Sequence, residues 1–251
     1  MKIEKIYDFL NQKFPVNTAA DYDNPGFLIG DKTADIKSAV LALDCTDSAV
    51  NLALETDSKL IITHHPVIFK GVKSIKKGDI IHSLIENGIS VISMHTNLDI
   101  AKDGVNDALC KTLELTDIET VIGYDGLAFR KGILKEEMSS DDFAAFVGKK
   151  LDTAVKYVGE GKVKTVAVCS GGGSDYFYDT LSLNCDAFVT SEVKHNLFLE
   201  AYKNNFTLVD AGHFPTEDVI IEPLKKLLEQ EFDNISFFTN HFSPIKVCIN
   251  L

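Results

Sequence analysis

The chain has 251 residues, with 25 Lys and Arg against 37 Asp and Glu, and a formal net charge of −12 at pH 7. An apolar share of 45% beside 25% charged residues is typical of a globular protein and excludes disorder as the main state. The acidic balance argues against direct binding to nucleic acid or to a membrane surface, because such polyanions select basic faces. Five scattered cysteines without a C-x-x-C pair, and charges at Lys2 and Glu4 where a signal peptide is apolar, predict a cytoplasmic protein with reduced thiols and no membrane span.

Helical and strand-like segments alternate through the first half of the chain. Apolar spacing and caps predict helices over 2–14, 47–55, 79–87 and 105–113 and strands over 38–43, 60–63 and 90–94. Asp44 or Thr46 is the expected N-cap of the second helix, because a short polar side chain there accepts from the first turn. This alternation predicts an α/β architecture with a largely parallel sheet.

The second half repeats the alternation. We expect strands over 126–134, 164–169, 187–190, 207–210, 237–239 and 245–249 and helices over 140–151, 174–183, 195–204 and 219–231. Pro223 requires that the last helix begins near Val219 or bends, because proline fits only a first turn or a kink. The break between the two runs predicts two α/β lobes, 1–124 and 125–251, with an approximate boundary near Tyr124.

A pair of neighbouring histidines, His64 and His65, directly follows the apolar strand over 60–63. Adjacent strand residues point to opposite faces, so the two side chains do not easily chelate one ion from a regular strand. At a strand end, each histidine can serve a different ion of a close pair, or one can bind metal and the other substrate. The alternative is two polar residues at the rim of a loop.

Two further segments place histidine and carboxylate side chains after strands. Asp99 closes the sequence His-Thr-Asn-Leu-Asp and offers an oxygen able to bridge two metals, with His95 and Asn97 in support. His213 and Glu217 lie four residues apart, and a helix beginning at Pro215 would favour an ionised Glu217 in its first turn. A loop with an Asx turn and a helix-capping acid are the respective alternatives.

Taken together, the three segments predict a metal site. Ligands gather at the carboxyl ends of parallel strands, and all three segments follow strands. Three imidazoles with two carboxylates suit two divalent ions, which would be Zn, Mn, Fe, Co or Ni rather than Ca. Such a pair lowers the pKa of a bound water and holds phosphate-like oxygens.

The chain resembles the NIF3-like family, also called the GTP cyclohydrolase I type 2 or DUF34 family, over essentially its whole length. The segments that carry the resemblance are 20–27 (ADYDNPGF), 43–46 (LDCT), 63–66 (THHP), 95–99 (HTNLD), 190–192 (TSE) and 212–217 (GHFPTE). This chain departs from the family pattern at Tyr22, often Trp, at Ser191, usually Gly, and at Asn196, which breaks a further His-His pair. It is also of the short type, without the inserted domain of longer relatives.

The resemblance implies a site and an assembly. It implies two α/β lobes with a dinuclear metal site in the cleft between them, and a ring-shaped homohexamer. The implied metal ligands are His64, His65, Asp99, His213 and Glu217. Asp99 and Glu217 would bridge the two ions.

The resemblance and the ligand set together predict a metal-dependent hydrolase acting on a nucleotide or a related phosphate compound. In the form that the family name suggests, a hydroxide on the metals attacks C8 of GTP, with Glu192 or His195 carrying the proton. A non-catalytic metal-binding, metal-delivery or scaffold protein is the alternative. A DNA-linked role is opposed by the net charge of −12.

Two weaker signals accompany these motifs. A glycine-rich turn over 170–174 follows a strand and precedes a helix, and it is either a plain turn or a phosphate-binding loop beside the metals. A lysine-rich loop after the His-His pair either attracts an anionic substrate or is solvated surface; its lysines are Lys70, Lys73, Lys76 and Lys77.

Overall fold

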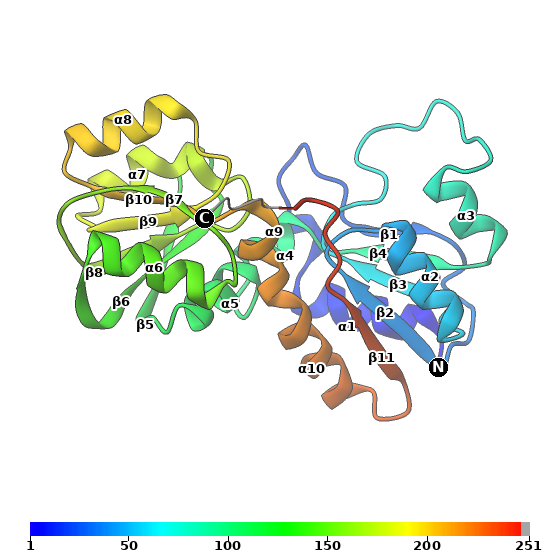
Figure 1. Ribbon diagram of the computed structural model, residues 1–251. Helices are drawn as coiled ribbons and strands as arrows, with labels where there is room; N and C mark the ends of the chain where they lie inside the picture. The colour runs from blue at the N-terminus through cyan, green and yellow to red at the C-terminus, as the bar shows by residue number, and fades with distance from the viewer. Residues whose placement is uncertain (247–251) are drawn as a thin grey trace. The chain divides into compact units, whose positions relative to one another are not determined.

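The computed structural model describes residues 1–246, and these form two compact units (Figure 1). The first unit contains residues 1–98 and 221–242, and the second contains residues 99–220 and 243–246. The main segment of the second unit, 99–220, is therefore an insertion in the sequence of the first. The predicted boundary near Tyr124 falls between strands β5 (Thr116–Ile122) and β6 (Ala128–Ser139), inside the second unit. Among the described residues, no helix is long and apolar enough to cross a membrane.

The first unit is built on a five-stranded sheet with the order β1-β4-β3-β2-β11. Its strands are β1 (Gly26–Ile29), β2 (Ser38–Ala42), β3 (Leu60–Thr63), β4 (Ser90–Ser93) and β11 (Ser236–Asn240). All neighbouring pairs are parallel except β1 with β4. The carboxyl ends of β2, β3 and β4 therefore meet at one edge of the sheet.

Helices cover both faces of this sheet. They are α1 (Ile3–Lys13), α2 (Asp47–Glu55), α3 (Ile80–Glu86) and α10 (Ile221–Glu231). Val40 and Ala42 of β2 pack in one apolar cluster with α2 and α3. Leu41 alternates with them and is also fully buried, so the opposite face is covered as well, and α10 contacts β2 and β11.

The second unit is built on a six-stranded mixed sheet with the order β5-β6-β8-β9-β10-β7. Its remaining strands are β7 (Lys156–Val158), β8 (Lys162–Val168), β9 (Ala187–Thr190) and β10 (Thr207–Asp210). Only the adjacent strands β8, β9 and β10 are parallel. The expectation of a largely parallel sheet is wrong here, because β5 and β6 form a hairpin and β7 pairs antiparallel with β10.

The helices of the second unit lie on both faces of its sheet. They are α5 (Val105–Thr112), α6 (Ser140–Lys150), α7 (Phe177–Ser182) and α8 (His195–Lys203). One apolar cluster joins α5 and α6 to alternate residues of β8 and β9, and a second cluster joins α7 and α8 to the other face. Each unit is therefore a sheet between two helical layers, and the predicted α/β class with two lobes is confirmed.

Short helices complete the structure. They are α4 (Thr96–Ile100), α9 (His213–Glu217) and the 3₁₀ turns Val16–Thr18, Gly173–Tyr176 and Asp218–Ile220. The last long helix begins at Ile221, so Pro223 lies in its first turn, as its missing N–H requires. Thr46, rather than Asp44, caps α2 and accepts from the backbone N–H of Ala49. The strand expected over 245–249 falls largely on 247–249, outside the described residues.

Candidate metal centre

Three histidines follow neighbouring parallel strands of the first unit. β3 ends at Thr63 and continues into His64 and His65, and β4 ends at Ser93, two residues before His95. Thr63 lies opposite Ser93 in the register, and their hydroxyl oxygens are 2.7 Å apart. The parallel pairing therefore delivers all three imidazoles to the same edge of the sheet.

Each of these imidazoles is held through the same ring atom. Nδ1 hydrogen-bonds to an oxygen in every case, and the pairs are His64 with the carbonyl of Met94 (2.8 Å), His65 with Asp44 (2.7 Å) and His95 with Asp23 (2.7 Å). A carbonyl or carboxylate oxygen accepts, so Nδ1 carries the proton. Nε2 is then the nitrogen with which each ring would coordinate a metal. Metal-binding histidines in proteins are oriented in this way.

Asp23 is set up to remain ionised beside His95. Its buried carboxylate also accepts from the backbone N–H of Thr96 (3.0 Å) and from the Thr96 hydroxyl (2.5 Å). Burial raises the pKa of Asp23, but the hydrogen bonds from His95 and Thr96 outweigh it and lower the pKa to about 2. The fixed carboxylate thus holds the loop 20–26 and the His95 ring together.

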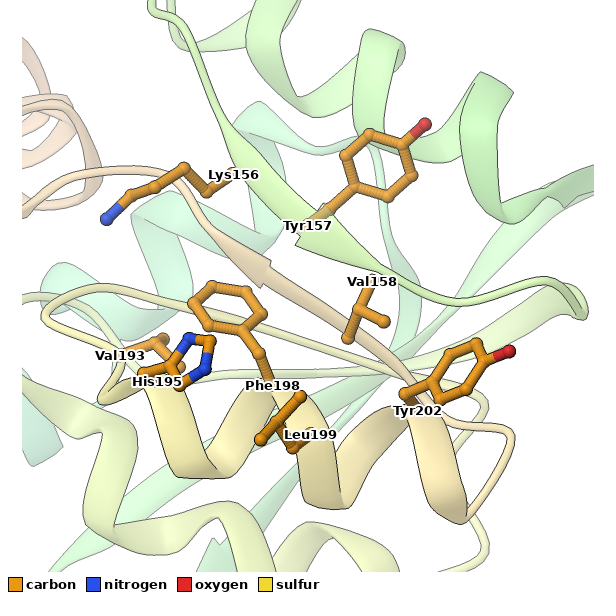
Figure 2. Close-up of a pocket in the computed structure, with 8 residues that line it drawn as sticks. All are labelled: Lys156, Tyr157, Val158, Val193, His195, Phe198, Leu199 and Tyr202. Atoms are coloured by element: carbon orange, nitrogen blue, oxygen red, sulfur yellow. The ribbon is translucent and has the colours of Figure 1, made fainter.

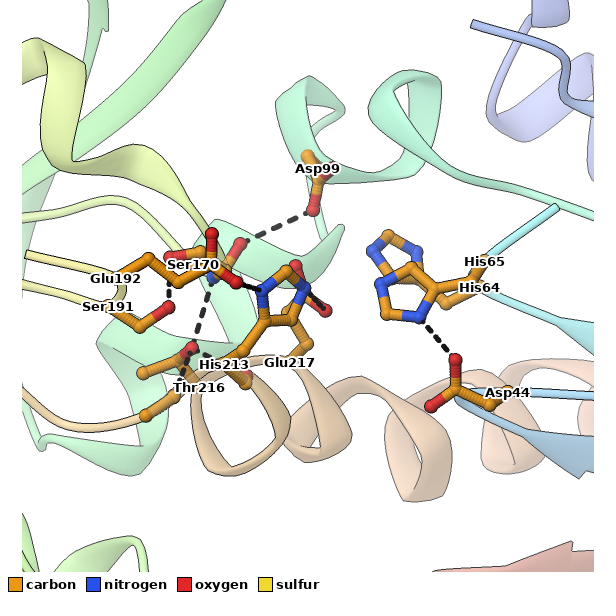
Figure 3. A network of polar contacts seen from close by, with 12 residues as sticks. Asp44, His64, His65, Asp99, Ser170, Ser191, Glu192, His213, Thr216 and Glu217 are labelled. Carbon is orange, nitrogen blue, oxygen red and sulfur yellow. Dashed lines mark hydrogen bonds and ion pairs between the residues drawn. The ribbon is translucent and has the colours of Figure 1, made fainter. Parts of the chain in front are cut away.

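In the second unit, His213 and Glu217 lie on α9, which follows β10 (Figure 3). Nδ1 of His213 donates to Oε1 of Glu192 (2.8 Å), and its Nε2 is 3.0 Å from Oε2 of Glu217. This separation is that of an ion pair, and the ring nitrogen and the carboxylate oxygen are both donors that a metal ion would accept.

The glycine-rich turn after β8 packs directly against this pair. Gly171 has φ +58°, and a Cβ there would lie 1.9 Å from Oε1 of Glu217 and 3.2 Å from Nε2 of His213. The N–H of Gly171 donates to the Thr216 hydroxyl (3.0 Å), and the Ser191 hydroxyl donates to its carbonyl (2.5 Å). The turn therefore borders the predicted metal ligands of this unit and is not an isolated connection.

Asp99, at the start of the second unit, is held by residues around it. The Ser170 hydroxyl donates to Oδ1 of Asp99 (3.3 Å), and the Asn106 amide donates to its carbonyl (3.1 Å). The backbone N–H of Ser170 in turn donates to Oδ1 of Asn106 (2.8 Å). Asp99 is thereby tied to the same turn that borders Glu217.

Arg130, the single arginine of the sequence, fixes the segment that follows Asp99. Its guanidinium donates to the carbonyls of Ile100 (3.0 Å) and Ala101 (2.9 Å) and is paired with Asp107. Arg130 is 3% exposed. No sequence pattern identifies this residue, because a lone arginine in a strand gives no sign of its partners.

The two residues predicted as proton carriers lie in different surroundings. Glu192 has a left-handed backbone (φ +56°) and orients His213. His195 begins α8 and lines a pocket of about 450 Å³ with the residues Lys156, Tyr157, Val158, Val193, Phe198, Leu199 and Tyr202 (Figure 2). Asp44, expected only as a possible cap, is instead the partner of His65.

The residues of each unit thus fit a transition-metal ion. Imidazole nitrogens with a few carboxylate oxygens suit Zn, Mn, Fe, Co or Ni, whereas Ca²⁺ takes six or more oxygens. Groups of His, Asp and Glu able to hold a metal occur among the described residues, including one made of His64, His65 and His95. The donor chemistry agrees with the predicted metal binding.

The fold and these donor sets define an α/β protein with candidate metal ligands at strand ends, and comparison with known proteins shows its family. The family model described as Duf34/NIF3 (NGG1p interacting factor 3) matches residues 1–246, and the chain belongs to this family. The resemblance drawn from the sequence motifs is therefore confirmed.

Two relatives match this chain along nearly their whole length. A protein of Clostridium acetobutylicum is 30% identical over 98% of both chains, and one of Campylobacter jejuni is 33% identical over 91% of this chain and 92% of its own. Both are named GTP cyclohydrolase 1 type 2 homolog. The crystal structure of a Staphylococcus aureus hypothetical protein matches 99% of both chains with a TM-score of 0.93 and 31% identity.

Proposed function

We propose that this protein is a dinuclear metal-dependent hydrolase acting on a nucleotide or a related phosphate compound. The proposed ligands are His64, His65, Asp99, His213 and Glu217, which would hold one pair of divalent ions. The observation that carries the proposal is the shared orientation of the histidines, each held at Nδ1 by an oxygen. Structural histidines need no such common pattern.

The two ions would lower the pKa of a bound water and stabilise negative charge on substrate oxygens. The chain's own groups orient the ligands: Asp44 holds His65, and Glu192 holds His213. The Glu192 side chain is 63% exposed, so it can also exchange a proton with a substrate. Glu192 and His195 remain the proposed proton carriers.

An exposed aromatic pair favours a substrate with a planar ring. Tyr22 is 68% exposed and Phe69 is 42% exposed, and their ring centroids are 6.5 Å apart. Phe69 is 6.0 Å from the ring of His95, so the pair borders the histidines of the first unit. The Asn24 amide donates to the carbonyl of Ile68 (2.6 Å) and ties the two loops together.

These features, together with the name of the relatives, support a nucleobase as the part of the substrate that stacks on Tyr22 and Phe69. The exposed lysines that follow Phe69 would attract its phosphates; they are Lys70, Lys73, Lys76 and Lys77.

Elemental analysis of untagged protein, followed by assays on GTP and a panel of phosphate esters, tests the proposal. We expect close to two ions per chain, hydrolysis of at least one substrate, and loss of both in His64→Ala and Glu217→Ala. His82→Ala is the matched control, because His82 lies on α3, where it pairs with Glu86 at 3.6 Å. Full metal content without turnover on any substrate would favour metal delivery, and a content near zero after adding Zn, Mn, Fe, Co or Ni would refute the metal centre.

The substrate part of the proposal has its own test. Stacking on a single aromatic side chain contributes about 1–3 kcal/mol, so Tyr22→Ala should raise KM about tenfold or more while the metal content stays constant. Tyr178→Ala, at a similarly exposed tyrosine of α7 (60%), should leave KM unchanged. An unchanged KM in Tyr22→Ala would remove the stacking platform from the proposal.

The ring-shaped homohexamer implied by the family resemblance is also part of the proposal. Native mass spectrometry should give six times the 27.6 kDa chain mass. A monomer or dimer at micromolar concentration would contradict it.

A further inference from the structure

We infer that Asn106 and Thr216 are positioning residues for two carboxylates of the second unit, those of Asp99 and Glu217. They act through the turn after β8, because the backbone of residues 170–171 lies between them and bonds to both. The inference deepens the proposed function and rests on it, since it takes Asp99 and Glu217 as metal ligands. All of these residues belong to the second unit.

The two carboxylates lie close together although α4 and α9, which carry them, are far apart in the sequence. An oxygen of Asp99 and an oxygen of Glu217 lie within 4.8 Å of each other. Glu217 is 4% exposed, and like charges repel one another more strongly where water is scarce. The surrounding protein therefore has to hold both groups at this separation until an ion neutralises them.

Asn106 connects Asp99 to the turn. It is 1% exposed and lies in the first turn of α5. Its Nδ2 donates to the carbonyl of Asp99 (3.1 Å), and its Oδ1 accepts from the backbone N–H of Ser170 (2.8 Å). The Ser170 hydroxyl in turn donates to Oδ1 of Asp99 (3.3 Å). One buried amide thus fixes the backbone of Asp99 and also the residue that contacts its carboxylate.

Thr216 connects the same turn to α9. It is fully buried, and it lies in the sequence between His213 and Glu217. Its hydroxyl accepts from the backbone N–H of Gly171 (3.0 Å) and donates to the carbonyl of His213 (2.8 Å). The Ser191 hydroxyl holds the carbonyl of Gly171 from the other side (2.5 Å). The backbone that borders the Glu217 carboxylate is therefore anchored to the helix that carries this carboxylate.

These hydrogen bonds form one continuous bridge from Asp99 to α9, and Figure 3 shows Ser170 between Asp99 and Thr216. A purely structural role would require only that each buried N–H of the turn has an acceptor. Here both acceptors are side chains that also bind the backbone of a proposed ligand residue. The bridge therefore transmits the position of one proposed ligand to the other.

Cobalt binding to the full-length apo-protein tests the inference, because the visible bands of Co²⁺ report ligand geometry as well as affinity. Thr216→Val keeps the shape of the side chain and removes its hydroxyl. It should weaken the binding of at least one Co²⁺ per chain about tenfold or more and shift the visible bands. Thr216→Ser keeps the hydroxyl and should restore both affinity and spectrum.

Thr180→Val is the matched control. Thr180 is also fully buried in a short helix, α7, and its hydroxyl likewise donates to the carbonyl three residues earlier, that of Phe177 (2.7 Å). This variant removes a comparable buried hydroxyl, so it should lose stability as Thr216→Val does. Its Co²⁺ affinity and spectrum should nevertheless match those of the wild type.

A double-mutant cycle tests the bridge itself. Asn106→Ala and Thr216→Val should each weaken Co²⁺ binding, and the double variant should lose less than the product of the two losses. The reason is that a break at either end already separates Asp99 from α9. Independent, fully multiplicative losses would show that the two residues do not act through one turn and would overturn the inference.

Two further results would overturn it: wild-type Co²⁺ affinity and spectrum in folded Thr216→Val, or an equal loss in Thr180→Val. If Thr216→Val does not fold, Ser170→Ala takes its place, and unchanged Co²⁺ binding there refutes the inference. Each of these failures would leave a wild-type content of two ions and the hydrolysis intact. Failure of the proposed function would instead appear in the wild-type protein, as missing metal or missing turnover.

Discussion

The backbone of Gly171 lies so close to the Glu217 carboxylate that a methyl group on residue 171 would clash with it. A Cβ on Gly171 would lie 1.9 Å from Oε1 of Glu217, and the backbone there is left-handed with φ +58°. The carboxylate can therefore reach its position only because residue 171 has no side chain.

Gly171→Ala should consequently displace Glu217 and lower the metal content by at least one ion per chain. The matched control is Gly88→Ala, which has nearly the same φ of +62° but no heavy atom within 4 Å of its added Cβ. Both variants should lose about 1 kcal/mol of stability or somewhat more from the left-handed backbone. Elemental analysis with thermal unfolding separates the two effects, and equal metal content in both variants would contradict the prediction.

Glu192 should tune the metal affinity through His213. The hydrogen bond from Nδ1 of His213 to Glu192 fixes the ring and raises its basicity, and loss of such a partner costs about 10–100-fold in metal affinity. We expect this loss for Glu192→Ala and a smaller one for Glu192→Gln, measured by competition with a chromophoric chelator. Glu136→Ala, at an exposed carboxylate of β6, serves as the control and should match wild type.

The ion pair of Arg130 with Asp107 should be essential for stability. Arg130→Ala leaves a buried carboxylate uncompensated and the carbonyls of Ile100 and Ala101 without their donor, which should cost about 3–5 kcal/mol. Lys111→Ala removes an exposed pair with Asp103 (61% and 63% exposed) and should cost at most about 1 kcal/mol. Urea unfolding of both variants checks the contrast, and similar midpoints would contradict it.

The half-buried Cys45 and the buried Cys110 and Cys185 should resist alkylation in the native protein. Burial, with nearby acidic groups, raises the pKa of Cys45 and Cys110 to about 12, and burial raises that of Cys185 to about 11. Because the thiolate is the reactive form, these thiols remain protonated and slow at pH 8. Iodoacetamide labelling with peptide mapping should modify them only after denaturation, and rapid native labelling at Cys110 would refute the prediction.

Most of the central helices and strands could be predicted, because the residues that mark them lie within or next to each element. The helix over 47–55 and the strands over 60–63, 187–190 and 207–210 coincide with the structure, since caps and short apolar runs mark their ends. The strand β5 was missed because its residues are largely exposed and acidic side chains interrupt it at Asp117 and Glu119. Its pairing with β6 depends on the hairpin and not on an apolar run.

The hydrogen-bond partners of the candidate ligands could not be predicted from sequence patterns. The sequence predicts Glu192 only as a proton carrier, yet in the structure it is the hydrogen-bond partner of His213, 21 residues away. His95 finds its carboxylate 72 residues earlier, at Asp23. Such pairs form only when the strands are registered side by side, which spacing along the chain does not encode.

The first unit is made of two separate sequence segments, and this affects the order in which it can fold during synthesis. Its sheet is completed by β11 (Ser236–Asn240), which pairs with β2, while the whole stretch 99–220 belongs to the other unit. On a ribosome, the stretch 99–220 is synthesised in full before α10 and β11 of the first unit emerge. The sheet that carries His64 and His65 is therefore complete only after β11 has been synthesised.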